Sequence, residues 1–310
     1  MTKTLFIDGE AGTTGLEIRQ RLRGLSHVAV RSLDAAARRD RAARRALMAE
    51  VDLVVLCLPD EAAREAADMI EGLGSSAAKL LDASTAHRVA PGWEYGFAEL
   101  AAGQVARIAA APRVANPGCY ATGAIALLRP LIDAGLIPPD YPLSIQGVSG
   151  YSGGGKAMIS DHEQAGGPAF ELYGLSLNHK HIPEIMRHSG LTTRPIFVPS
   201  VGHFRQGMVV MVPLHLDALP GRPTAREINS VFDERYHATR LVQVRRPPVD
   251  QRLQPDPISG SDLMEVYVFE NEAESQAVLV ARLDNLGKGA AGAAVQNIGL
   301  MLGLPDGVDR

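Results

Sequence analysis

The stretch that decides the fold is residues 4–18, "TLFIDGEAGTTGLEI". Its first five residues are typical of a buried strand, and the residues after the last glycine have the pattern of a helix. Between them stand Gly9, Gly12 and Gly15, three residues apart. This order predicts a dinucleotide site, because glycines admit a pyrophosphate and helix N–H groups complement its charge. A plain strand-to-helix turn would show the same GxxGxxG spacing.

Strand and helix patterns alternate outward from this loop through the first third of the chain. Apolar segments that predict strands are each followed by an alanine-rich or amphipathic segment that predicts a helix. Such alternation predicts a parallel sheet with helices on both faces. The expected strands are residues 4–8, 28–32, 52–60 and 79–84, and the expected helices are residues 15–25, 35–50 and 61–72.

The pattern changes after Cys119. Longer runs of β-branched or alternating residues follow, and these suit a mixed or antiparallel sheet. A helix of small residues is expected at 289–304. The expected strands of this part are residues 142–151, 194–201, 207–216, 264–270 and 276–285.

Composition limits the functional classes. The 310 residues are 46% hydrophobic and 21% charged with a net charge of −4, so no charge excess suggests nucleic acid or a membrane surface as a partner. The first residues lack the apolar core of a signal peptide, and no stretch of about 18 apolar residues could span a bilayer. The two cysteines, Cys57 and Cys119, favour a reducing compartment over a disulfide scaffold. We therefore expect a cytoplasmic protein.

The end of the second expected strand indicates which dinucleotide binds. Enzymes that use NAD usually place an acidic residue there for the ribose hydroxyl, whereas this chain has Arg31 and Ser32. A cation and a hydroxyl suit the 2′-phosphate of NADP. The arginine-rich segment 38–45 either adds positive potential to this site or forms a solvated helix face.

The segment "ANPGCYATG", residues 115–123, places Cys119 after a Pro-Gly corner and before an apolar run at 124–136. A helix start lowers the pKa of a thiol, and a thiolate attacks acyl carbons to form a thioester. Cys57 lies within an apolar strand and is expected to be an inert core thiol. A nucleotide fold with a cysteine at a helix start predicts hydride transfer to a thioester, while a structural role for Cys119 stays open.

Six segments resemble one enzyme family. They are "GEAGTTGLEIRQRL", "VVLCLPDEAA", "LLDASTAHR", "NPGCYATG", "HKHIPEI" and "DNLGKGAAGAAVQN", and they resemble the N-acetyl-γ-glutamyl-phosphate reductases, relatives of aspartate-semialdehyde dehydrogenase. The length and "LCLPD" resemble the shorter of the two forms of that enzyme. The resemblance covers nearly the whole chain. It implies NADP(H) as cofactor, N-acetyl-γ-glutamyl phosphate as substrate, phosphate as product, and arginine biosynthesis.

The resemblance implies catalytic roles for three residues. Cys119 would be the nucleophile and His181 the base, with His203 as a rival base. Glu184 stands three residues after His181, where it orients that histidine or caps the helix. The His-Lys-His spacing matches no closed zinc site, so no metal is expected.

Binding residues are predicted partly from position and partly from the resemblance. The longer family members carry Arg-Gly where this chain has Gln206-Gly207, which leaves the anchor of the substrate carboxylate open. Lys156 and a flexible loop at 149–155 are further candidates for the phosphate, and a plain solvent loop is equally consistent with that segment. The expected cofactor contacts are Gly9, Gly12, Thr13, Thr14, Gly15, Arg31, Ser32, Pro59, Ser84, Gly287, Lys288 and Gly289. The expected substrate contacts are Asn116, Arg113, Ser149, His179, Arg205 and Gln206.

We therefore expect an α/β protein with a Rossmann-type NADP-binding domain, residues 1–116 and 284–310. Residues 117–283 would form an α+β catalytic and dimerisation domain with a mixed sheet. We expect a homo-oligomer, a dimer or tetramer, with no nucleic acid or membrane partner. Two alternatives remain open. One is a reductase of another acyl phosphate, such as aspartyl phosphate or a carrier-protein-bound homologue, and the other is an NADPH-binding regulator without catalytic activity.

Overall fold

A computed structural model describes residues 2–25, 27–74 and 77–304 of the chain. The chain forms two compact units, each with its own sheet. Unit 1 comprises Met1–Ala98, Ala102–Pro117 and Ala290–Arg310, and unit 2 comprises Glu99–Ala101 and Gly118–Gly289. The α/β class expected from the sequence is confirmed, with a parallel sheet in unit 1 and a mixed sheet in unit 2.

Unit 1 contains a six-stranded parallel sheet with the strand order β2-β1-β3-β4-β6-β5. The chain passes from β1 to one side and then returns to the other side, so the end of β1 is a topological switch point, where such sheets bind ligands. The strands are β1 Lys3–Asp8, β2 Val28–Arg31, β3 Leu53–Leu56, β4 Lys79–Asp82, β5 Glu94–Tyr95 and β6 Arg113–Ala115.

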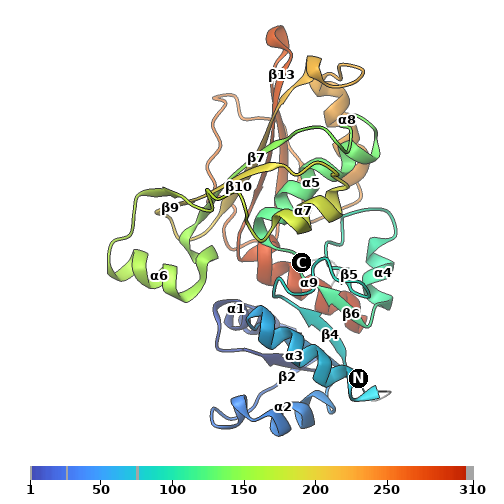
Figure 1. The fold of residues 1–310 in the computed structure, drawn as a ribbon, viewed down its shortest axis with the longest axis vertical. Coiled ribbons are helices and arrows are strands. Elements are labelled where there is room, and N and C mark those ends of the chain that lie inside the picture. The colour runs from blue at the N-terminus through green and yellow to red at the C-terminus, as the bar shows by residue number, and fades with distance from the viewer. Residues whose placement is uncertain (1, 26, 75–76, 305–310) are drawn as a thin grey trace. The chain divides into compact units, whose positions relative to one another are not determined.

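Alternate side chains of the central strands build two separate cores. Leu5 and Ile7 of β1 pack with helices α1, α4 and α9, whereas Phe6 packs on the opposite face with α2 and α3 (Figure 1). Burial on both faces explains why these strands are continuous apolar runs in the sequence. The helices are α1 Thr13–Leu22, α2 Arg41–Met48, α3 Asp60–Glu71, α4 Gln104–Ala110 and α9 Gly292–Leu302.

The single helix predicted for residues 35–50 is wrong, because the structure divides it in two. A short 3₁₀ turn, η1 (Ala37–Arg39), comes first, and α2 begins after Asp40. The Asp40 carboxylate accepts hydrogen bonds from the N–H groups of Ala42 and Ala43. This N-cap starts a new helix and ends the preceding turn.

Unit 2 contains a seven-stranded mixed sheet with the strand order β11-β12-β13-β10-β7-β9-β8. Helix α5 packs against α7, against α8 and against strands β10 and β13 (Figure 1). The strands are β7 Ser144–Gly150, β8 Phe170–Leu172, β9 Ile196–Gly202, β10 Met208–His215, β11 Val242–Val244, β12 Met264–Asn271 and β13 Gln276–Leu283. The helices are α5 Cys119–Asp133, α6 Gly155–Gln164, α7 Ile182–Ser189 and α8 Ala225–Tyr236.

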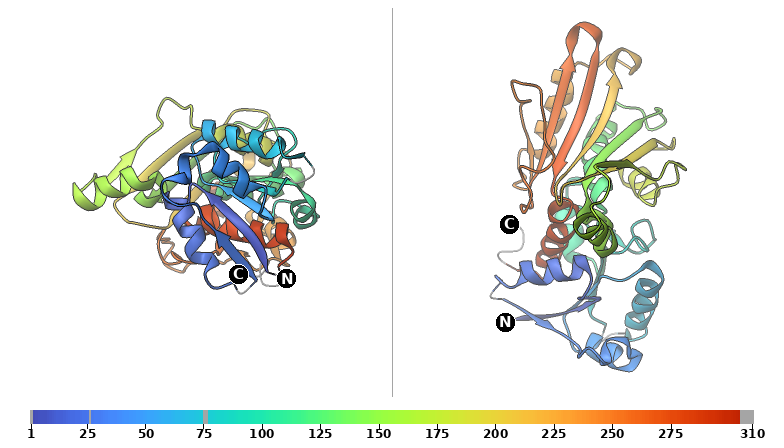
Figure 2. Two further views of the ribbon diagram at one scale, coloured as in Figure 1. Left: turned by 90° about the horizontal axis from the view of Figure 1, so that it is seen from below. Right: turned by 90° about the vertical axis from the view of Figure 1, so that its left-hand side faces the viewer.

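Close packing fixes α5 on this sheet. A Cβ atom added to Gly123 would lie 2.7 Å from a methyl carbon of Val210 in β10, so only glycine lets the helix approach this far. On the opposite face Val209, Tyr267 and Val280 form a second apolar cluster, against which Leu253 packs. Leu253 belongs to the long connection between β11 and β12, which runs beside these strands (Figure 2, right).

Candidate active site

Residues that follow four parallel strands gather at one edge of unit 1. Gly9 follows β1, Pro59 stands shortly after β3 as the N-cap of α3, Ser84 follows β4, and Asn116 follows β6. The carboxyl ends of parallel strands share one edge of a sheet, and α/β folds bind nucleotides there. The structure thus brings four predicted site residues from distant parts of the sequence to the same edge.

The geometry of the glycine loop fits a dinucleotide. Gly9 has a φ of +90°, and a Cβ atom on it would lie 2.3 Å from the carbonyl oxygen of Cys57. A Cβ atom on Gly15 would lie 2.7 Å from the Gly9 carbonyl oxygen, so packing inside unit 1 requires both glycines. Gly12, the N-cap of α1, meets no atom closer than 3.4 Å at that position. The protein itself does not demand glycine there, whereas a pyrophosphate that approaches the backbone does.

A cavity of about 110 Å³ lies beside this loop. It adjoins the switch point at the end of β1, and Leu33 and Leu58 give it apolar walls. An apolar recess with a few polar groups at this place suits the adenosine part of a dinucleotide. The cavity is lined by Phe6, Ile7, Asp8, Gly9, Glu10, Leu33, Arg38 and Leu58.

The two residues predicted to recognise the 2′-phosphate have different surroundings. Arg31 forms a half-exposed ion pair with Glu50 at 2.9 Å. Ser32 instead donates a hydrogen bond of 2.8 Å to the Glu10 carboxylate, which also receives Arg19 and Arg38. Sequence reasoning did not select Glu10 or Arg19 and treated Arg38 only as part of a basic run. The charge of Glu10 inside a glycine loop was the sequence signal that could have identified this cluster.

Arg44, also in the arginine-rich segment, is not on a solvated face. Its guanidinium is buried and donates to the Asp8 carboxylate at 2.6 Å and 3.1 Å. Burial raises the pKa of Asp8 above its ordinary value, and the neighbouring Arg44 opposes that rise. The pair joins α2 to the end of β1, next to the glycine loop.

Asn116 is a buried junction within unit 1. Its side-chain amide donates to the carbonyl oxygen of Ala290 at 3.0 Å and accepts from Asn297 of α9 at 3.0 Å. The buried Arg88 donates to the backbone carbonyl of Asn116 at 3.0 Å. These bonds tie three distant segments to the residue that precedes the Pro-Gly corner. The sequence analysis did not single out Arg88 or Asn297.

In unit 2, Cys119 is the first residue of α5, where a helix start was expected. Its N-cap, Gly118, donates its N–H to the Glu184 carboxylate at 2.8 Å. Glu184 lies in α7 and is only 1% exposed. A buried carboxylate from a neighbouring helix therefore holds the residue in front of the thiol. Cys57 is not a candidate for the reactive thiol, because burial, together with Asp82 and Asp8, raises the pKa of its thiol to about 12.

The two histidines of "HKH" stand together beside the residue that follows the thiol. The ring of His181, the N-cap of α7, lies 6.1 Å from the ring of Tyr120, and the His179 ring meets the His181 ring edge-on at 4.8 Å. Nδ1 of His179 accepts the backbone N–H of His181 at 3.2 Å, which places the ring proton of neutral His179 on Nε2. Burial, with Lys180, lowers the pKa of His179 to about 4, so it is neutral at pH 7.

The rival base, His203, has another partner. Its Nδ1 lies 2.9 Å from Nδ1 of His162 in α6, and the two rings are stacked at 5.1 Å. Tyr151 stacks on the other histidine of this pair at 4.7 Å. The ring of Tyr120 contacts His179, His181 and Phe197, so both histidines of "HKH" lie beside the residue that follows Cys119.

The segment before α9 forms a π-type turn, η6 (Gly287–Ala291). A Cβ atom on Gly289 would lie 2.8 Å from the Cβ atom of Cys119, so this glycine packs directly against the candidate nucleophile. Nζ of Lys288 donates to both carboxylate oxygens of Glu99 at 2.7 Å and 2.8 Å, and both residues are buried. The ammonium is thus committed to Glu99, and its predicted contact with the cofactor stays a prediction.

The predicted substrate residues are not all brought together. Ser149 is buried at the end of β7, and Gln206 donates to Asp284, which precedes η6, at 2.5 Å. Arg205 forms an ion pair with Glu163 of α6. Arg113 belongs to unit 1, where it lies 3.3 Å from Glu71 at the end of α3. It therefore lies at the amino edge of the parallel sheet, opposite the edge that carries Asn116.

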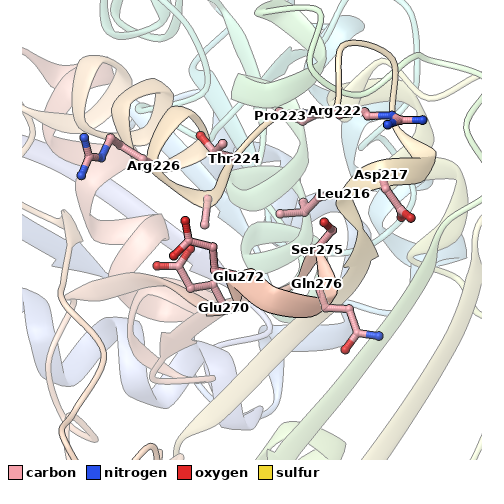
Figure 3. Close-up of a pocket in the computed structure, with 11 residues that line it drawn as sticks. Leu216, Asp217, Arg222, Pro223, Thr224, Arg226, Glu270, Glu272, Ser275 and Gln276 are labelled. Atoms are coloured by element: carbon pink, nitrogen blue, oxygen red, sulfur yellow. The ribbon is translucent and has the colours of Figure 1, made fainter.

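A larger pocket, about 510 Å³, lies in unit 2 and contains none of the predicted site residues. Figure 3 shows Glu270 and Glu272 next to each other, with the guanidinium groups of Arg222 and Arg226 directed to opposite sides. Within residues 2–25, 27–74 and 77–304, no helix has the length and apolarity needed to cross a bilayer. The same residues contain no group of three histidine, cysteine or acidic side chains placed to hold a metal ion.

Comparison of the fold with solved structures gives several aspartate semialdehyde dehydrogenases, among them the following two. Enzyme II from Vibrio cholerae superposes with a TM-score of 0.75 at 17% identity, covering 98% of this chain and 100% of that one. The enzyme from Candida albicans, solved with NADP, gives a TM-score of 0.64 at 14% identity, with 99% and 100% coverage. At this identity the likeness establishes the fold alone.

Comparison of the sequence establishes the family. Residues 119–285 match the family described as "Semialdehyde dehydrogenase, dimerisation domain". The N-acetyl-gamma-glutamyl-phosphate reductases of Brucella ovis and Brucella anthropi are each 50% identical over 313 residues, covering 98% of this chain and 100% and 99% of theirs. The thiol at the start of α5, the nucleotide-binding edge and these relatives agree, and the chain belongs to the N-acetyl-γ-glutamyl-phosphate reductase family.

Proposed function

We propose that this protein reduces N-acetyl-γ-glutamyl phosphate to N-acetylglutamate semialdehyde, releasing phosphate, in arginine biosynthesis. The observation that carries the proposal is the position of Cys119, at the first residue of α5, with Gly118 held by Glu184 and Gly289 packed on its side chain. Full-length identity of 50% to reductases of that name supports the substrate. NADPH, when bound at the edge of unit 1, supplies the hydride.

Cys119 is proposed to attack the acyl carbon as a thiolate, which forms a thioester and expels phosphate. The N-terminal end of α5 favours the thiolate, because the helix dipole and its N–H groups stabilise a negative charge there. The N–H groups of Tyr120 and Ala121 in its first turn are proposed to stabilise the oxyanion, because the helix offers these groups no acceptor of its own. The N–H of Gly118 is not among them, since it is bonded to Glu184.

Hydride addition to the thioester carbon gives a hemithioacetal, which releases the aldehyde when the C–S bond breaks. His181 is proposed to donate and accept the protons at oxygen and sulfur during these steps. His181 is only 5% exposed and its ring lies beside Tyr120, which limits exchange with bulk water. Neutral His179, whose Nδ1 accepts the His181 N–H, is proposed to keep Nε2–H as a donor for the substrate.

We further propose that the protein is a homo-oligomer, a dimer or tetramer, in the cytoplasm. The matched family covers residues 119–285 and is described as a dimerisation domain. The two free thiols are compatible with a reducing compartment. Size-exclusion chromatography with light scattering tests the oligomer, and a monomer at micromolar concentration would contradict it.

The deciding experiment is phosphate-dependent reduction of NADP⁺ by N-acetylglutamate semialdehyde, run beside aspartate semialdehyde. We expect turnover with the first aldehyde, dependence on added phosphate, and loss of turnover in Cys119→Ala. Turnover with aspartate semialdehyde alone would assign the chain to a different acyl phosphate. Tight NADPH binding without turnover of either aldehyde, and a Cys119 unreactive toward iodoacetamide, would indicate a nucleotide-binding regulator.

A further inference from the structure

Three side chains of unit 1 meet at the carboxylate of Glu10. Nη2 of Arg38 donates to one oxygen at 2.8 Å, and Oγ of Ser32 donates to the other at 2.8 Å. Nη1 of Arg19 donates to that second oxygen and also to Oγ of Ser32 at 2.7 Å. Glu10 is 7% exposed, whereas the side chains of Arg19 and Arg38 are 37% and 46% exposed. One buried carboxylate thus receives two guanidinium groups and a hydroxyl that remain open to solvent.

The cluster stands at a place with a defined use in nucleotide folds. Ser32 follows β2, and Glu10 and Arg38 line the 110 Å³ cavity at the end of β1. The adenosine ribose of a dinucleotide lies at the end of the second strand, where an acid marks NAD and cations mark NADP. This chain has both, because the cations come from α1 and η1 while the acid comes from the glycine loop.

We propose that Glu10 competes with the 2′-phosphate of NADP for Arg19, Arg38 and Ser32. It thereby lowers the ratio of the affinity for NADP to the affinity for NAD. The inference rests on the proposed use of a nicotinamide dinucleotide. A 2′-phosphate carries about two negative charges at neutral pH and prefers guanidinium donors, the same groups that Glu10 holds. When the protein binds the 2′-phosphate, either the arginines break their bonds to Glu10, or the phosphate and the Glu10 carboxylate lie close together and repel each other. Either outcome weakens NADPH binding.

The same carboxylate has the opposite effect on NAD. A ribose 2′-hydroxyl is a hydrogen-bond donor, and an acidic side chain beside the second strand is its usual acceptor. Glu10 can take that bond without losing both arginines, since its two oxygens have different partners. The discrimination between the cofactors is therefore set by a balance between Glu10 and the two arginines, and Arg31, paired with Glu50, contributes less.

The test is calorimetric titration of the full-length protein with NADPH, NADH, 2′,5′-ADP and 5′-AMP, none of which requires turnover. Glu10→Gln keeps the shape and removes the charge. We expect it to tighten NADPH and 2′,5′-ADP by about tenfold and to leave NADH and 5′-AMP unchanged or weaker. Arg38→Gln is expected to weaken the two 2′-phosphorylated ligands by about tenfold and to leave the other two unchanged.

Glu50→Gln is the matched control, because it removes one negative charge from a half-exposed partner of Arg31. It is expected to change all four affinities by less than about twofold. The double variant Glu10→Gln/Arg38→Gln adds a coupling measurement: if the two residues act on one phosphate, their effects are not additive. Circular dichroism and thermal melting of each variant show whether the fold is intact.

Two results would overturn the proposal. If Glu10→Gln weakens NADPH as much as Arg38→Gln does, the carboxylate orients the arginines for the phosphate and does not compete with it. If Glu10→Gln changes NADPH and NADH equally, it has no part in discrimination. A wild-type protein that binds none of the four ligands would instead refute the nucleotide-binding assignment itself. Binding of NADPH without turnover of either semialdehyde would refute the proposed substrate and leave this inference standing.

Discussion

Two glycine-rich segments serve opposite purposes in this protein. In "DGEAGTTG", residues 8–15, two glycines are required by close chain packing, Gly12 is not, and Glu10 binds arginines that are open to solvent. In "DNLGKGAAG", residues 284–292, Gly289 touches Cys119 and the polar side chains are buried and bonded within unit 2. The first segment leaves room for a ligand, and the second fills the space around a thiol.

The difference shows that glycine content alone does not identify a ligand site. What distinguishes the segments is where the missing Cβ atom would have pointed and how the nearby charges are solvated. Around Glu10 the partners are exposed and exchangeable, so small changes in charge tune binding. Around Lys288 the charges are buried, so the same change affects the fold.

The largest effect is expected from Cys119, the thiol against which Gly289 of the second segment packs. Cys119→Ala should lower turnover by about 10⁴-fold or more, because the nucleophile is lost and no thioester forms. NADPH affinity, measured by calorimetry, should be unchanged. Turnover within tenfold of wild type would remove Cys119 from the mechanism.

Loss of the buried ion pair Lys288–Glu99 should lower the free energy of unfolding more than loss of the exposed pair Arg38–Glu10. Lys288→Met leaves the Glu99 carboxylate buried without its ammonium partner, and we expect the free energy of unfolding to fall by about 3–5 kcal/mol. Arg38→Gln, in the exposed pair, should cost less than about 1 kcal/mol. Urea denaturation of both variants measures the two losses in the free energy of unfolding. Equal losses would contradict the difference between the buried and the exposed pair.

Replacing Gly289 and replacing Gly12 by alanine should have different effects, because the two added Cβ atoms meet different neighbours. Gly289→Ala places a Cβ atom 2.8 Å from that of Cys119, and the resulting shift of the thiol should lower kcat by about 100-fold. Gly12→Ala meets only ordinary contacts within the protein, so it should fold normally and weaken NADPH binding. Steady-state kinetics and calorimetry on both variants test this, and a loss of kcat confined to Gly12→Ala would reverse the comparison.

The smallest effect concerns pH. The pKa of His179 is lowered to about 4 in the folded protein from an ordinary value of 6.5, so below pH 6.5 the unfolded chain binds a proton that the folded chain does not. Stability therefore falls as pH drops from 6.5 toward 4, and this contribution is absent above 6.5. In His179→Gln the decline should be shallower over that window. Urea midpoints measured from pH 4 to 8 check it, and identical slopes would show that His179 does not titrate as described.

The sequence predicted strands β1 to β4 of the parallel sheet, because its central strands are continuous apolar runs that are buried on both faces. The short strands β5 and β6 were not predicted. The sequence also predicted the helix start at Cys119 from the Pro-Gly corner and the apolar run. The break at Asp40 was missed, because the alanine- and arginine-rich run favours helix on both sides of a local cap. Three other helices, α4, α6 and α8, were not proposed at all, and of α7 only a helical turn around Glu184 was expected.

Side-chain partners were the part of the site that the sequence could not supply. Glu10 is held by residues 9 and 28 positions later, and Glu184 reaches Gly118 across 66 positions. Such pairings depend on which strands and helices become neighbours, and local patterns do not encode that. The resemblance named Lys288 by position, and Arg205 was selected by residue type. Only the structure shows that Glu99 and Glu163 already hold their charges.

The last helix of the chain has a consequence for biogenesis. Ala294, Ile298 and Leu302 of α9 belong to the same core as Leu5 and Ile7 of β1, although unit 2 is encoded between them. During synthesis on the ribosome, the first strands emerge long before the helix that covers them. Unit 2 can therefore complete its fold first. Until α9 has been synthesised, the apolar face of the parallel sheet that it covers in unit 1 stays exposed. A nascent chain arrested before residue 290 is accordingly a substrate for chaperones and proteases.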